Sequence, residues 1–96
     1  MKIVINRCFG GFNLSEEGEE EWLNRKGFPL QPEEFWTSLD IPRNDPTLVQ
    51  LVEEDAWRYG GPLSYLRVVA VPDGVEWVIE EHDGMEVVAE RHRTWY

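Results

Sequence analysis

The residue types best suited to binding chemistry lie near the two ends of the chain. Residues 6–12 read Asn-Arg-Cys-Phe-Gly-Gly-Phe and place Arg7 beside the only cysteine and a glycine pair. Arginine is a fork-shaped donor that suits carboxylate or phosphate, and backbone N–H groups at a glycine turn are open to a close ligand. The candidate ligand-binding residues of this segment are Asn6, Arg7, Cys8, Phe9, Gly10, Gly11 and Phe12.

The second group lies in the closing run Glu-Arg-His-Arg-Thr-Trp-Tyr. If a strand continues through it, Arg91, Arg93 and Trp95 share one face and His92 points to the other. Cations beside aromatic rings can hold an anionic group and stack a planar ring, which are the two demands of a nucleotide. We therefore add these four residues to the candidate site, and we expect Arg7 and Arg93 on adjacent strands at one edge of a shared cleft.

A purely structural interpretation of the same residues stays open. Arg7 would then pair with one of the nineteen acidic residues, Cys8 would fill the core, and the glycines would only form a turn. The closing run would be a charged strand end with a terminal aromatic residue. The five glutamates within residues 16–21 also oppose a phosphate near Gly10 and Gly11, so arginines from elsewhere would have to offset them.

Signals for catalysis or metal binding are weak. Cys8 with His82 or His92 could form a nucleophile and base, but no recognised motif surrounds the cysteine. The two histidines, one cysteine and scattered carboxylates lack the compact spacing of a metal site, and P-loop, GxGxxG and GxSxG motifs are absent from the sequence. We expect a non-enzymatic protein without a metal or cofactor.

Composition limits the classes of partner. The chain has 96 residues and a formal net charge of −10, so we expect one domain over residues 1–96 that does not bind polymeric nucleic acid, since such binding depends on clustered Lys and Arg. A single cysteine allows no internal disulfide, and no apolar run is long enough for a membrane span or a signal segment. These features predict a cytoplasmic protein that does not enter membranes.

The order of elements predicts an α+β fold. A strand at residues 2–6 precedes a helix that Ser15 caps and Gly27 ends, a short helix at residues 32–38, and a helix that opens at Asp45-Pro46. Three strands between residues 65 and 91 are joined by two Asp-Gly turns. We expect a two-layer sandwich of about four mainly antiparallel strands, with two to three helices on one face.

Three strings of the sequence carry a resemblance. They are INRCFGGFNLSEEG at the start, PDGVEWVIEEHDG in the last third and AERHRTW at the end. With them the chain resembles a set of small phage and prophage proteins of this length, nearly end to end. The resemblance implies a viral accessory protein in the cytoplasm of a bacterial host, where such proteins often block a defence enzyme or sequester its nucleotide signal.

Three functions follow as expectations. The first is capture, without turnover, of a small anionic ligand such as a cyclic or linear nucleotide, in a pocket that a homo-oligomer could complete. The second is an acidic protein inhibitor or DNA mimic that binds a basic host defence protein through acidic residues such as those at 16–21. The third is a small enzyme that uses Cys8 or His92.

Overall fold

The computed structural model describes residues 1–28, 37–90 and 94–95. The elements in chain order are β1 (Lys2–Asn6), α1 (Glu16–Lys26), the 3-10 helix η1 (Ser38–Asp40), α2 (Pro46–Tyr59), β2 (Leu66–Ala70), β3 (Val78–His82), β4 (Met85–Ala89) and β5 (Thr94–Trp95). The predicted α+β class and the antiparallel strands are confirmed. The short helix expected at residues 32–38 lies mostly outside the described residues.

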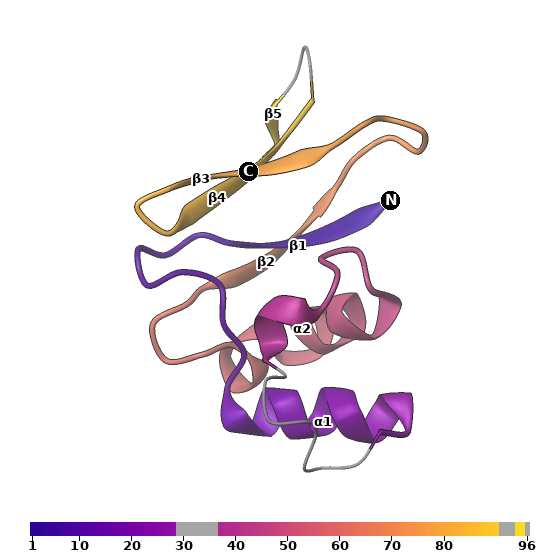
Figure 1. The fold of residues 1–96 in the computed structure, drawn as a ribbon, viewed down its shortest axis with the longest axis vertical. Helices are drawn as coiled ribbons and strands as arrows, with labels where there is room; N and C mark the ends of the chain where they lie inside the picture. Colours follow the sequence, from indigo (N-terminus) through magenta and orange to yellow (C-terminus); the bar gives the residue numbers. More distant parts are fainter. Residues whose placement is uncertain (29–36, 91–93, 96) are drawn as a thin grey trace.

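The strands divide between two sheets, which stack on one another. β1 pairs with β2 with Val4 opposite Val68, and β4 lies between β3 and β5 in the second sheet. Figure 1 shows the resulting order from bottom to top: α1, α2, the β1–β2 ribbon, and the β3–β4–β5 sheet. The helices therefore cover one face of the β1–β2 ribbon, and the second sheet covers the other.

Two apolar clusters fill the spaces between these layers. Val4 and Leu66 belong to the cluster between the ribbon and the helices, together with Trp22, Leu48 and Leu51. Alternate residues of the same strands, Ile3, Ile5 and Val69, join Val88 of β4 in the second cluster. Because successive side chains of a strand point to opposite faces, the apolar residues Ile3, Val4 and Ile5 of β1 are buried on both sides, between exposed Lys2 and buried Asn6.

Both long helices begin and end where the sequence indicates. The Ser15 hydroxyl accepts a hydrogen bond from Gly18 N, and Gly27 takes the left-handed conformation that closes α1. Asp45 caps α2 by accepting from Leu48 N, with Pro46 at the first helical position. The last turn of α2 follows a break at Asp55, whose φ is −163°.

The two Asp-Gly turns have different roles. Asp83 and Gly84 both have positive φ, 52° and 86°, as a tight turn between β3 and β4 requires. The turn at Asp73-Gly74 makes no hairpin, because β2 pairs only with β1 among the described strands. It carries the chain from the first sheet to the second, so the expected hairpin at Asp73-Gly74 is wrong.

Candidate functional site

Asn6 lies at the end of β1 and is fully buried. Its side-chain Nδ2 donates to the carbonyl oxygens of Cys8, at 2.6 Å, and Gly84, at 2.8 Å, while Oδ1 accepts from Tyr65 N at 2.8 Å. One amide therefore ties the end of β1 to the loop that follows it, to the start of β2 and to the β3–β4 turn. This geometry gives the Asn6 side chain a structural role, and its contact with a ligand stays a prediction.

Glu86 and Arg43 form a buried ion pair beside Asn6. Arg43 donates to both carboxylate oxygens of Glu86, from Nη1 at 2.6 Å and from Nη2 at 2.8 Å, and Asn6 N donates to Glu86 Oε1 at 2.7 Å. The Glu86 side chain is only 5% exposed. A charge buried this deeply requires such bidentate pairing, so the pair joins β4 to β1 and to the segment before α2.

Arg43 also explains the position of Phe12. The guanidinium carbon of Arg43 lies 3.6 Å from the centre of the Phe12 ring, and this ring is buried in the helix-side core. One face of Phe12 is therefore occupied by a cation of the protein itself. The Phe12 ring thus belongs to the core, and its part in ligand binding stays a prediction.

Arg7 is held against the second sheet. Its Nη1 donates to the carbonyl oxygen of Glu86 at 2.9 Å, and its backbone N–H donates to the carbonyl oxygen of Tyr65 at 2.8 Å. The side chain also borders an open hollow of about 610 Å3, lined by Arg7, Phe9, Glu80, Glu81, His82, Met85 and Val87. The two glutamates on this wall oppose an anion, so the hollow gives only partial support to the expected phosphate site.

The loop after Arg7 combines partly open side chains with backbone packed closely against its neighbours. Cys8 is a free thiol of intermediate exposure. Gly11 has φ 85° and Gly10 lies directly against Leu63, whose backbone a Cβ at position 10 would overlap. Gly10 is therefore needed for packing, and its backbone approaches Leu63 of the same chain.

The C-terminal half of the expected site is only partly described. Arg91, His92 and Arg93 lie outside the described residues, as does the expected distance between Arg7 and Arg93. Thr94 and Trp95 form β5, where Trp95 pairs with Val88 and Thr94 with Ala89. β1 and β5 belong to different sheets with β4 between them, so the expected adjacency of the first and last strands is wrong.

The described structure has a set of exposed apolar side chains at one end that the sequence pattern did not indicate. It comprises Phe9, Leu63, Tyr65 and Trp57, which are 73%, 71%, 45% and 79% exposed. The rings of Trp57 and Tyr65 meet edge to face with centroids 5.6 Å apart, and the contact of Gly10 with Leu63 brings Phe9 to the same end. We call these four residues the aromatic end.

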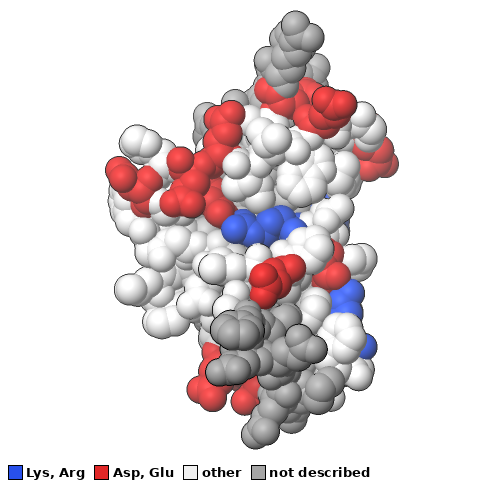
Figure 2. Space-filling view, in the orientation of Figure 1, with Lys and Arg blue, Asp and Glu red and all other residues white. Residues whose placement is uncertain are grey.

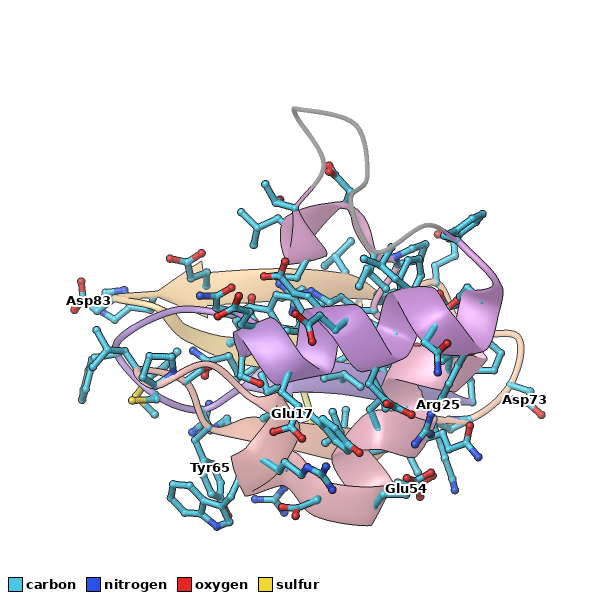
Figure 3. All side chains as sticks on the ribbon, turned by 90° about the horizontal axis from the view of Figure 1, so that it is seen from below. Glu17, Arg25, Glu54, Tyr65, Asp73 and Asp83 are labelled. Carbon is cyan, nitrogen blue, oxygen red and sulfur yellow. The ribbon has the colours of Figure 1, made fainter. Side chains whose placement is uncertain are left out.

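Three connections of the fold position the aromatic end. The loop after β1, the loop between α2 and β2, and the β3–β4 turn all lie on one side of the molecule, at the left of Figure 1. Figure 3 shows Tyr65 and Asp83 at this end and Asp73 at the opposite one. Only Phe9 was a predicted site residue. The sequence could have indicated Trp57, because tryptophan is uncommon at exposed positions of a helix. Its position in the helix was not recognised as exposed.

Acidic side chains outnumber basic ones on the surface. Figure 2 shows Asp and Glu in several separate groups on one face, and Lys and Arg in a few small areas, among uncharged residues. Most described cations are paired with acids: Lys2 with Glu53, Arg25 with Glu21 and Glu54, and Arg58 with Glu17. In α1, burial and the neighbouring Glu16 raise the pKa of Glu19. The surface therefore favours a positively charged partner.

Two classes of site are not seen in the described part of the chain. Residues 1–28, 37–90 and 94–95 contain no group of three His, Cys, Asp or Glu side chains placed to hold a metal ion. Among the same residues, no helix has the length and apolar character to cross a membrane.

The comparisons with known proteins supply no relative. Protein-family models, curated proteins and solved structures were each compared with this chain, and none of them matches it.

Proposed function

We propose that this protein is a non-enzymatic binding protein that docks on a positively charged protein through its aromatic end. The observation that supports it most is that four large apolar side chains, each 45–79% exposed, come from α2 and two loops at one end of the molecule, where the rings of Trp57 and Tyr65 are in contact. Isolated exposed apolar residues are common on monomers, but a contiguous aromatic patch is typical of an interface. Tryptophan and tyrosine are also the residues that most often dominate binding energy.

The charge of the chain determines the class of partner. At −10, the protein repels other acidic surfaces and attracts basic ones over about a Debye length of 8 Å. This steering raises the association rate, while the aromatic end supplies the desolvated contact that slows dissociation. The resemblance to phage accessory proteins supports a bacterial defence protein as the partner.

Affinity capture tests the proposal. The immobilised protein and its Trp57→Ala variant are exposed to the same bacterial extract, and proteins retained only by the unmodified chain are identified and purified. We expect one basic protein whose retention falls at least tenfold with Trp57→Ala and weakens as salt increases. Val78→Ala is the control, since Val78 is 58% exposed and lies outside the aromatic end. Retention that is equal on both chains, or an acidic partner, contradicts the proposal.

A second candidate is capture of a small anion, such as a cyclic nucleotide, in the hollow beside Arg7. Its support is that Arg7 and Phe9 border one hollow of about 610 Å3, which is large enough for a nucleotide. Arg7→Ala is a poor test because it also breaks the bond to Glu86 O. Glu80→Gln is better: removing a negative charge from the wall should tighten anion binding in a calorimetric titration, and Glu53→Gln should not. Unchanged or weaker binding with Glu80→Gln contradicts this second function.

A further inference from the structure

We infer that the outer edge of β2 accepts an extended segment of the partner protein as an added strand, in which an acidic side chain pairs with Arg67. This inference rests on the proposed function and names the backbone element that continues the interface. Strand addition of this kind gives affinity through backbone hydrogen bonds and specificity through alternate side chains.

The register of the β1–β2 ribbon shows which backbone groups of β2 face outward. Arg7 N donates to Tyr65 O and Val71 N donates to Met1 O, at the two ends of the ladder. Hydrogen-bonded and non-hydrogen-bonded pairs alternate in an antiparallel ladder, so Arg67 and Val69 also bond to β1. The N–H and C=O groups of Leu66, Val68 and Ala70 then point away from β1, and no hydrogen bond reaches them from any described residue.

The other edge of the ribbon is closed. Val4 N donates to Arg43 O at 2.8 Å, and Asn6 N donates to Glu86 Oε1 at 2.7 Å. These contacts satisfy the outward N–H groups of Val4 and Asn6 and cover the edge of β1 at these two residues. β2 has no such cover in the described structure, and an uncovered edge is a template for pairing with another chain.

The outer edge of β3 differs in charge. β3 contains Glu80 and Glu81, and exposed charges on an edge strand discourage pairing. β2 reads Leu-Arg-Val-Val-Ala, with Arg67 as its one charged residue. Compared with β3, β2 is therefore the strand whose composition favours an added strand.

Arg67 supplies the charge that such a segment would meet. Its side chain is exposed and makes no ion pair or hydrogen bond with the described part of the chain, although the protein has nineteen acidic residues. It shares a face of β2 with Val69, so an acidic side chain on that face of an added strand lies within reach. A carboxylate there would gain a bidentate partner that costs no existing bond.

The aromatic end lies at the start of the same strand. Tyr65 directly precedes β2, and Trp57 of α2 packs against it with ring centroids 5.6 Å apart. A segment added along β2 therefore runs into the aromatic pair. The aromatic pair therefore lies next to the first residue of the β2 edge.

A second copy of this chain suits the edge less well than a different protein. Two copies bring together two domains of net charge −10. Symmetric antiparallel pairing centred on Val68 would also place the two Arg67 side chains on diagonal positions, about 7–8 Å apart. Both effects oppose self-pairing, so the occupant is a segment of another protein with an acidic residue opposite Arg67.

The test uses a displayed library of short random peptides, selected on the immobilised full chain. Enriched peptides are titrated by fluorescence polarisation against Ala70→Pro, Ala70→Ser and Arg67→Ala. Proline at position 70 removes an outward N–H without breaking the ladder to β1, whereas serine keeps that N–H. We expect enriched peptides to carry Asp or Glu within an extended apolar run. Affinity should fall about tenfold with Ala70→Pro and Arg67→Ala and stay within twofold with Ala70→Ser.

Amide hydrogen exchange of the complex gives the second measurement. We expect the bound peptide to slow exchange at Leu66, Val68 and Ala70. Equal affinity for Ala70→Pro, unchanged exchange at these amides, or a dimer of the free chain in light scattering overturns the inference. If Trp57→Ala abolishes partner binding but Ala70→Pro does not, the inference is overturned and the proposed function still stands. If neither variant loses partner binding, both the inference and the proposed function are contradicted.

Discussion

Glu86 illustrates at the scale of single residues why chemistry-bearing side chains can be structural. Its carboxylate receives two hydrogen bonds from Arg43 and one from Asn6 N, so three segments far apart in sequence meet on one buried charge. Neither Glu86 nor Arg43 was a predicted site residue. Period-two alternation in Met-Glu-Val-Val-Ala places Glu86 and Val88 on one face of β4. From the sequence alone, a glutamate on a strand is predicted to be exposed, because the arginine that pairs with it in the fold is not known.

Removing the Glu86 carboxylate should strongly destabilise the fold. Glu86→Ala leaves the partly buried Arg43 guanidinium, whose side chain is 17% exposed, without its counterion, and breaking a buried pair in this way costs about 3–5 kcal/mol. This is a large share of the roughly 5–10 kcal/mol expected for a domain of this size. Urea unfolding followed by tryptophan fluorescence measures the change. Glu81→Ala, at an exposed position of β3, should stay within about 0.5 kcal/mol, and equal effects of the two variants would refute the assigned role.

Asp45 should make stability depend on pH in the acid range. Burial raises the pKa of this carboxyl. Hydrogen bonds from Lys26, Trp22 and Leu48 N together lower the pKa by more than burial raises it, so the pKa lies below its ordinary value. A depressed folded pKa stabilises the fold above the unfolded value of about 3.9 and loses that contribution as pH falls through the folded pKa. Asp45→Asn should therefore flatten the fall in melting temperature below about pH 4. An acid limb identical to that of the unmodified chain contradicts this assignment.

At the scale of elements, the helices were predictable and the sheet arrangement was not. Ser15, Gly27 and Asp45-Pro46 are local signals, and each marks a helix boundary in the structure. Whether a strand pairs with the next strand in sequence depends on how its faces pack against elements that are far away in the sequence. The apolar residues on both sides of β1 require two covering layers, which the sequence pattern alone does not assign.

The two Asp-Gly turns offer a matched pair of substitutions. Gly84 has φ 86°, and a Cβ there would overlap the backbone of Phe9, whereas Gly74 has φ 83° with open space around it. Gly74→Ala should cost about 1–2 kcal/mol from the left-handed conformation alone. Gly84→Ala should cost clearly more, because the Phe9 loop must also move. Chemical denaturation of both variants decides this, and equal costs would contradict the close packing of the turn on residues 9–11.

Hydrogen exchange in the free protein tests the register of β2. The N–H groups of Arg67 and Val69 bond to β1, whereas those of Leu66, Val68 and Ala70 point outward. We expect slow exchange at the first two amides and faster exchange at the other three, in strict alternation. Uniform protection along β2 would mean that its outer edge is covered.

At the scale of the whole molecule, the proposed function rests on the net negative charge and on the aromatic end. The acid-rich exterior was evident from composition, but the aromatic end arises only when three loops meet on one side of the stacked sheets. Phe9 was predicted from its neighbours Arg7 and Gly10. Trp57, Leu63 and Tyr65 come from a helix, a loop and the start of a strand, respectively. That they lie at one end of the molecule could be seen only in the folded structure.

The most direct test is a calorimetric titration of the captured partner with the full chain, Trp57→Ala, Phe9→Ala and the control Val78→Ala. We expect each aromatic substitution to weaken binding by at least about 2 kcal/mol, which is close to thirtyfold in Kd, with no change for the control. If both aromatic variants bind as tightly as the unmodified protein, the aromatic end is not the docking surface and the proposed function is wrong.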